Sequence, residues 1–204
     1  AAGTEKWRFI AEGPVRIAPS YASGKIYFGS DDGRAYCVDA ATGAEVWRYS
    51  PVAAPDAVIP HNLDFVSLTA CRTGVLVQNG RAHAGFGFLP WDTAYLVALN
   101  ADTGAEIYKK TFNTSSKNGT LTGAADFSTT DNALTFEGSM LAVGDNSRLF
   151  VPQGRMSPLA FDMNSGTTQG RLAGAGGSWT LITPDNGRVV VGPSYGNQYD
   201  SRRV

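Results

Sequence analysis

The sequence predicts an all-β protein made of repeats of one four-stranded unit, and three observations support this class. The segment 37–47 recurs at 98–108 and, in a weaker form, at 160–170. Short runs rich in β-branched and aromatic residues alternate with segments of Gly, Asp and Asn, as strands and tight turns do. No window combines the i, i+3, i+4, i+7 spacing of apolar residues with the caps of an amphipathic helix.

The first complete unit contains four candidate strands in order. We expect these strands at 15–21, 25–30, 34–38 and 44–49. Residues 31–33, Asp-Asp-Gly, form a tight turn after the second strand, because Gly accepts a positive φ. Residues 39–43 form another turn, in which Asp and Thr side chains bond nearby backbone amides. The unit is therefore an antiparallel meander whose last strand carries Trp47.

One unit of roughly 40 residues cannot bury both of its faces, so copies must stack on each other as the blades of a β-propeller do. Residues 3–7 repeat the tail of the motif without its head, so we expect the chain to begin inside a repeat. Equivalent glycines lie 40 residues apart from Gly3 to Gly43, then 61 to Gly104 and 62 to Gly166.

This spacing predicts how the chain divides into blades. Residues 1–9 end a preceding blade, three blades follow at 10–49, 50–110 and 111–172, and residues 173–204 form an incomplete blade. We interpret the chain as a partial propeller, about three to four blades of a larger ring. In the alternative, residues 3–9 complete the last blade and close a four-bladed ring.

The second and third units contain insertions, which in repeat proteins map to loops and often to the functional rim. The insertions lie at 50–62, 84–92 and 113–131. The segment 84–92 is apolar and aromatic, and such a segment in a loop either folds back on its blade or meets a partner. The candidate binding rim consists of His83, Phe86, Phe88, Trp91 and Tyr95.

The pattern Ala-x-Asp-x-x-Thr-Gly-x-x-x-Trp resembles the repeat of the PQQ-like β-propeller family. The matching residues are Trp7 before the first unit, Asp39, Thr42, Gly43 and Trp47 in the first, Asn100, Thr103, Gly104 and Tyr108 in the second, and Asp162, Ser165 and Gly166 in the third. The resemblance implies that the Trp side chains dock between neighbouring blades, which makes Trp7 and Trp47 structural.

The same resemblance implies two classes of function. The family includes PQQ-dependent quinoprotein dehydrogenases, the propeller of the outer-membrane assembly lipoprotein, and other bacterial extracytoplasmic proteins. The dehydrogenases hold PQQ with an adjacent Cys-Cys disulfide, a Trp, calcium ligands and a catalytic Asp. This sequence has no Cys-Cys pair. We therefore expect no catalytic, cofactor-binding or metal-binding residues in this chain.

The cysteines allow two interpretations, and the histidines give only a weak indication of a metal site. Cys37 and Cys71 are the only cysteines, and they either form one disulfide between adjacent units or are two buried thiols. His61 and His83 are the only histidines. Because the spacing of His61 and Asp64 is nonspecific and a third ligand is missing, we expect polar loop residues rather than a metal site.

Charge and hydropathy exclude two classes of partner. The net charge is −1 with scattered Lys and Arg, which argues against nucleic acid, and the apolar runs are too short for a membrane span. The favoured function is a noncatalytic propeller of the periplasm or cell surface. It would scaffold or bind a protein or glycan through its rim loops and contact the remaining blades. The alternative is part of a PQQ-dependent quinoprotein oxidoreductase.

Overall fold

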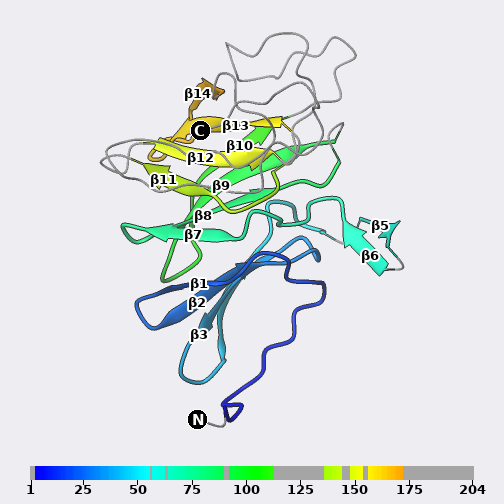
Figure 1. Cartoon of the computed structure of the whole chain (residues 1–204), viewed down its shortest axis with the longest axis vertical. Coiled ribbons are helices and arrows are strands. Elements are labelled where there is room, and N and C mark those ends of the chain that lie inside the picture. Colours follow the sequence, from blue (N-terminus) through cyan, green and yellow to red (C-terminus); the bar gives the residue numbers. More distant parts are fainter. Residues whose placement is uncertain are drawn as a thin grey trace.

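The computed structural model describes residues 3–55, 57–62, 64–89, 92–112, 136–143, 148–153 and 156–171. These residues form fourteen β-strands. The strands make three four-stranded antiparallel sheets and one two-stranded sheet, and the larger sheets stack on one another (Figure 1). Within the described ranges, no helix is long and apolar enough to cross a membrane. The all-β class and the partial propeller are confirmed.

The first blade follows the predicted meander, with its strands hydrogen-bonded in chain order. Its strands are β1 (Ser20–Ala22), β2 (Lys25–Gly29), β3 (Ala35–Asp39) and β4 (Glu45–Tyr49). The strand predicted at 15–21 is mostly wrong, because β1 begins only at Ser20. Pro14 and Pro19 flank this segment, and proline lacks the N–H that a strand ladder needs.

The second and third blades repeat the same order. The second contains β7 (Val75–Gln78), β8 (Arg81–Phe86), β9 (Ala94–Asn100) and β10 (Glu106–Phe112), and the third contains β11 (Leu141–Val143), β12 (Arg148–Gln153), β13 (Met156–Asp162) and β14 (Thr168–Arg171). The boundaries predicted between blades stay a prediction. The insertion 113–131 and the incomplete blade 173–204 lie outside the described residues.

The cross-strand register supports the sequence alignment of the repeats. Cys37 pairs with Trp47, and Ala98 pairs with Tyr108. In the third blade Ala160 pairs with Gly170, so a glycine takes the place of the aromatic residue. All three pairs lie beside a shift of register between the last two strands, which is a β-bulge repeated from blade to blade.

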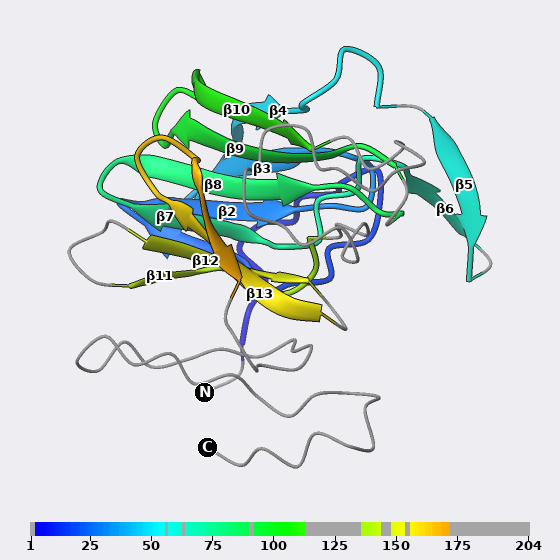
Figure 2. The same cartoon turned by 90° about the horizontal axis from the view of Figure 1, so that it is seen from above.

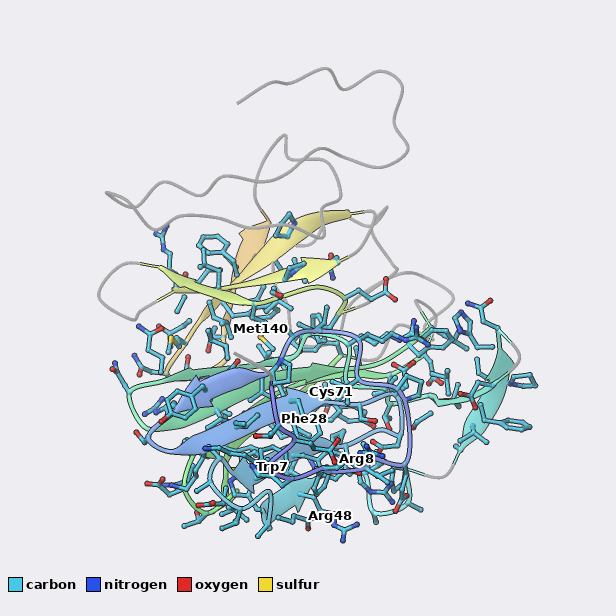
Figure 3. All side chains as sticks on the ribbon, turned by 60° about the horizontal axis from the view of Figure 1, so that its bottom comes forward. Trp7, Arg8, Phe28, Arg48, Cys71 and Met140 are labelled. Carbon is cyan, nitrogen blue, oxygen red and sulfur yellow. The ribbon has the colours of Figure 1, made fainter. Side chains whose placement is uncertain are left out.

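The core consists of apolar layers between the blades. One buried cluster joins Tyr27, Cys37 and Trp47 of the first blade with β7, β8 and β9. A second cluster joins the second and third blades around Phe112, Phe136 and Phe161. The outer side of the first blade is covered by the N-terminal segment, where Trp7 and Phe9 pack against Phe28 (Figure 3).

The two-stranded sheet is an addition to the propeller that the repeat pattern does not predict. It consists of β5 (Val58–His61), which falls within the predicted insertion at 50–62, and β6 (Asp64–Ser67), which lies beyond it. Its hairpin projects sideways from the stacked sheets (Figure 2). In the described part of the chain, neither the first nor the third blade carries such a hairpin.

Candidate functional site

The turn between the last two strands of each blade is built by one side-chain oxygen. Asp39 Oδ1 accepts hydrogen bonds from the amides of Ala41 at 3.0 Å and Thr42 at 2.8 Å, and from Thr42 Oγ1 at 2.8 Å. The hydrogen bonds from Thr42 lower the pKa of Asp39. Asn100 accepts the equivalent three bonds through Oδ1. Asn therefore replaces Asp in the second repeat without loss of an acceptor.

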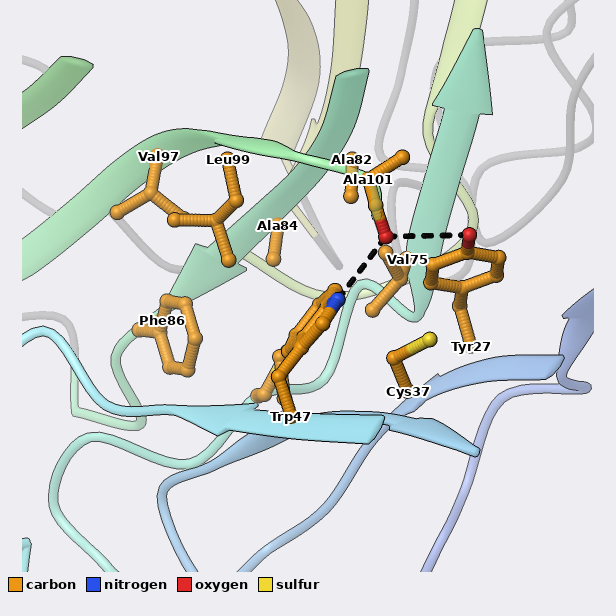
Figure 4. Packing of buried hydrophobic residues seen from close by; sticks show 12 residues of the cluster. Tyr27, Cys37, Trp47, Val75, Ala82, Ala84, Phe86, Val97, Leu99 and Ala101 are labelled. Carbon is orange, nitrogen blue, oxygen red and sulfur yellow. Dashed lines mark hydrogen bonds between the residues drawn. The ribbon is translucent and has the colours of Figure 1, made fainter. Parts of the chain in front are cut away.

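Three aromatic side chains, those of Trp7, Trp47 and Tyr108, each contact the turn of the blade that follows them in the chain. Trp7 Nε1 donates to Ala40 O at 3.0 Å, and Trp47 Nε1 donates to Ala101 O at 2.9 Å (Figure 4). Tyr108 OH lies 3.4 Å from Met163 O, the equivalent acceptor of the third turn. Each acceptor directly follows the Asp or Asn of its motif. We call this contact the aromatic latch.

The latch of Trp47, between the first and second blades, and the latch of Tyr108, between the second and third, differ in the polar side chain that lies beside the aromatic residue. Tyr27 OH also donates to Ala101 O, at 3.2 Å. His83 occupies the corresponding place in the next blade, and its Nδ1 lies 3.3 Å from Tyr108 OH. Burial, and to a lesser degree Arg81, lowers the pKa of His83 to about 4. His83 is therefore a neutral core residue beside the second latch.

The predicted binding rim does not face the solvent as a unit. His83 and Phe86 are both fully buried, so the prediction is wrong for these two residues. Phe88 is half-buried and Tyr95 packs against the core, while Trp91 lies outside the described residues. The segment folds back because apolar β8 side chains gain more from the inter-blade core than from water.

A charged cluster that sequence analysis missed joins the three blades. The side chain of Asp31 is 1% exposed. Arg72 binds it through both carboxylate oxygens, at 2.9 and 3.0 Å. Arg16 binds Asp31 at 2.5 Å, and Glu137 lies 3.3 Å from Arg72. The only sequence signal was Asp31 in a hairpin turn, and nothing in the sequence indicated a partner about forty residues away.

The guanidinium of Arg72 also links this cluster to the projecting hairpin. Its Cζ lies 4.3 Å from the centre of the Phe88 ring, within the range of a cation–π contact. The ring of His61 meets Phe88 edge-on at 5.1 Å. His61 therefore lies in β5 and packs inward, rather than in a polar loop as expected.

The two cysteines are both free and buried. Of the two alternatives, the structure has the buried thiols and not the disulfide. Burial raises the pKa of Cys37 to about 11 and that of Cys71 to about 12. Both are therefore protonated and unreactive at neutral pH.

The described residues do not fit the cofactor set that the resemblance implies. The only two cysteines lie in different parts of the chain, so an adjacent disulfide cannot form. The Asp31 carboxylate is held by two arginines. Across the described ranges, no three His, Cys, Asp or Glu side chains are grouped as metal ligands. We therefore derive no chemical step through PQQ or calcium.

A cleft lies where the projecting hairpin meets the second blade. It is bordered by the linker after β4, the base of the hairpin and the loop before β9, and its volume is about 180 Å³. Tyr95 of the predicted rim contributes to its wall. The burial of Tyr95 raises the pKa of its hydroxyl, with a smaller contribution from Asp92.

Comparison with known proteins supports this architecture. The family model described as the β-propeller domain of glucose, ethanol and alcohol dehydrogenases matches residues 4–172. Quinohemoprotein alcohol dehydrogenase from Comamonas testosteroni aligns with 78% of this chain and 21% of its own, at 18% identity and a TM-score of 0.51. The computationally designed Ika4 protein aligns with 94% of this chain and 99% of its own, at 12% identity and a TM-score of 0.52.

BamB from Moraxella catarrhalis aligns with 81% of this chain and 42% of its own, at 18% identity and a TM-score of 0.47. The chain spans 25% or less of the length of the similar dehydrogenases. At these identities the likeness shows the fold alone. No curated protein matches the sequence significantly.

Proposed function

We propose that this chain, which belongs to the family of the glucose, ethanol and alcohol dehydrogenase β-propeller domain, is part of a noncatalytic propeller that binds a protein partner. The proposal rests on one observation, the projecting β5–β6 hairpin with its exposed apolar face. As the resemblance of the repeats to extracytoplasmic propellers implies, we place the protein in the periplasm or at the cell surface.

The two faces of the hairpin differ in their environment. Val66 is fully buried on the inner face, where His61 meets Phe88. On the outer face Phe65 is 63% exposed and Val58 is 49% exposed. Pro60 pairs with Phe65 across the hairpin, so the outer side chains form one apolar surface. An aromatic side chain on a projecting element is a common anchor of protein interfaces.

The edges of the hairpin favour contact through this face rather than by strand addition. The amide of Phe65 donates to Asp64 Oδ1 at 2.8 Å, and the amide of Ser67 donates to Asp31 O at 2.8 Å. On the other edge, Pro60 has no N–H to donate. A partner strand would therefore find few donors on either edge.

The charged cluster supports a structural rather than a catalytic role for Asp31. A general base must be able to reach a substrate proton. Both oxygens of Asp31 bind Arg72, and Arg16 adds a third contact. These bonds join the first and second blades, and the contact of Arg72 with Glu137 extends the cluster to the third, which favours a scaffold.

Site-specific photo-crosslinking tests the proposal. A photoreactive phenylalanine analogue is placed at position 65 in cells of the source organism, with Tyr21 as the matched control, since Tyr21 is 71% exposed on β1. We expect one discrete protein adduct from position 65, lost on Val58→Asp, and none from position 21. Equal adducts from both positions, or glycan binding without a protein adduct, contradict the proposal.

A second assay addresses the enzymatic alternative. PQQ and calcium are added to the purified chain, and the melting temperature and dye-linked alcohol oxidation are measured. A ligand that binds the folded state raises the melting temperature by mass action. We expect no shift and no oxidation, whereas a concentration-dependent shift with turnover would establish the quinoprotein alternative.

A further inference from the structure

Residues 5–9 reproduce the outermost strand of a blade. Their sequence, Glu-Lys-Trp-Arg-Phe, is identical to Glu-Val-Trp-Arg-Tyr of β4 at three of five positions. Arg8 lies 2.8 Å from Glu5. Arg48 lies 2.9 Å from Glu45 in β4, so the two segments have the same local ion pair. The segment therefore has the side-chain contacts of an outermost strand.

The side chains of this segment alternate between two sides. Trp7, Phe9 and Ala11 pack against the first blade, and the latch of Trp7 fixes the segment there. The intervening side chains are exposed, with Arg8 in solvent and Ile10 81% exposed. Alternation with a period of two is that of an extended strand. The first blade thus holds the segment in the form of a strand.

The backbone of this segment has no strand beside it. Within the described ranges, no hydrogen bond joins an amide or carbonyl of residues 4–11 to another backbone group, and the segment runs as a separate dark blue trace (Figure 1). The equivalent strands β4 and β10 pair with β3 and β9. Unpaired groups along an extended segment are a template for another strand.

The complete blades show which strand fits this edge. Cys37 lies opposite Trp47 in the first blade. Ala98 lies opposite Tyr108 in the second. Both small residues are fully buried against the neighbouring blade. The residue of an incoming strand opposite Trp7 must therefore also be small, since a larger side chain would overpack the contact with the first blade.

We propose that residues 5–9 accept an antiparallel β-strand from a protein partner, with a small residue opposite Trp7. The incoming strand has the pattern apolar, Ala or Cys, apolar, Asp or Asn. This sequence contains the pattern at 36–39, 97–100 and 159–162, and all three belong to strands paired within their own blades. Main-chain hydrogen bonds provide affinity in strand addition, and a segment that is already docked lowers the entropic cost. This surface goes beyond the proposed function of the hairpin.

The charge of Arg8 favours an incoming strand without a basic residue opposite it. Like charges directly opposite each other on adjacent strands destabilise the pair. In the first blade Tyr36 faces Arg48. In the second blade Val97 faces Lys109. A neutral or acidic residue therefore fits the position that faces Arg8.

Binding of synthetic peptides to the isotope-labelled chain, followed by NMR, tests the inference. The probe, based on β3, is acetyl-Ser-Ala-Tyr-Ala-Val-Asp-Ser-amide. We expect it to shift the amides of residues 5–9 and to slow their hydrogen exchange about tenfold or more. Phe in place of the Ala between Tyr and Val should weaken binding about tenfold. Equal binding of the Phe peptide, or slow exchange of these amides before any peptide is added, overturns the inference.

Two N-methylated forms of the peptide provide a matched control. The amides of an antiparallel strand that pair with one neighbour alternate along the chain. One form is methylated at the odd residues and the other at the even residues. We expect one form to lose about tenfold or more in affinity, and the other to stay within about threefold of the parent peptide. Equal affinity of the two forms overturns the inference.

Variants of the segment test the role of its anchor. Trp7→Ala removes the latch and should weaken peptide binding about tenfold, because the segment is no longer held in place. Ile10→Ala, on the outward side, should have an effect below about twofold. If Trp7→Ala does not fold, Phe9→Ala takes its place. Wild-type affinity in the folded Trp7 or Phe9 variant overturns the inference.

Photo-crosslinking from position 8 in cells of the source organism tests the origin of the incoming strand. We expect an adduct with another protein. Peptide binding without such an adduct overturns the assignment to a protein partner. The result is independent of position 65, because an adduct from position 8 alone contradicts the role of the hairpin and supports this edge, and an adduct from position 65 alone does the reverse.

Discussion

The indole ring of Trp47 occupies the space that a side chain at Gly104 would need. A Cβ built on Gly104 would lie 2.8 Å from Trp47 Cγ. Gly104 also has a φ of 72°, which disfavours other residues. The same contact joins Trp7 with Gly43, and Tyr108 with Gly166. The motif glycine is therefore required by both the turn and the neighbouring blade.

Replacement of Gly104 by Ala tests this dual requirement. We expect a loss of about 2–4 kcal/mol in the free energy of unfolding, because left-handed backbone strain and overpacking against Trp47 add. Gly80→Ala is the control, since Gly80 has a φ of 71° and no atom within 4 Å of its Cβ position. It should cost about 1–2 kcal/mol. Equal losses in urea denaturation would show that the indole accommodates the methyl group.

Truncation of Trp47 should remove the latch between the first two blades. We expect Trp47→Ala to lower the free energy of unfolding by about 3–5 kcal/mol, as for other buried aromatic residues. Trp47→Phe retains most of the apolar contact area but loses the hydrogen bond to Ala101 O. Loss of this bond should lower the free energy of unfolding by about 1 kcal/mol. Urea denaturation measures both, and a near-zero effect of Trp47→Ala would exclude a latch.

The buried His83 should make the fold sensitive to acid. Its pKa falls from an ordinary 6.5 to about 4 in the fold. Between these values the unfolded chain binds the proton and the folded chain does not, so stability falls as pH falls through this window. Across this window the free energy of unfolding should fall by about 3 kcal/mol because of His83. The pKa values of Asp39 and Asp162 are lowered in the fold, so the stabilisation from these two groups is lost only as pH falls below the ordinary carboxyl value of 3.8.

His83→Gln provides the comparison, because Gln does not titrate. The difference in unfolding free energy between wild type and variant should change between pH 7 and pH 4, measured by denaturation at each pH. A difference independent of pH would mean that His83 is not buried as a neutral group.

The pair of Asp31 and Arg72 should show strong coupling in a double-mutant cycle. Arg72→Met should cost about 3–5 kcal/mol, because it leaves a buried carboxylate with a single remaining arginine. In Asp31→Asn, Arg72→Met should cost less, since the carboxylate charge is gone. Additive losses in urea denaturation would show that the two side chains contribute independently.

The stacked four-stranded repeats could be predicted from sequence because their determinants are local. The turn at Asp39 needs only an acceptor oxygen, a hydroxyl and a glycine within five residues. The same spacing at Asn100 and Asp162 produces the same bonds. Such patterns are visible in a single chain because every partner is a near neighbour in sequence.

The cleft and the charged cluster could not be predicted, because their partners are far apart along the chain. Arg72 lies 41 residues from Asp31 and 65 from Glu137. The linker after β4 and the loop before β9 meet only through the packing of the hairpin. No local pattern specifies such contacts, since the stacking of the blades determines them.

The candidate binding rim depends both on local sequence and on contacts between distant parts of the chain. The sequence by itself determined the apolar character of residues 84–92, because composition is a local property. The insertion predicted there is wrong for residues 84–86, which belong to β8 and pair with β9 up to Phe86 and Tyr95. Only the tertiary structure decided that Phe86 is buried in the core and that Phe88 covers Arg72. The physical reason is that burial depends on the surface that a neighbouring blade presents, and this surface exists only once the blades have stacked.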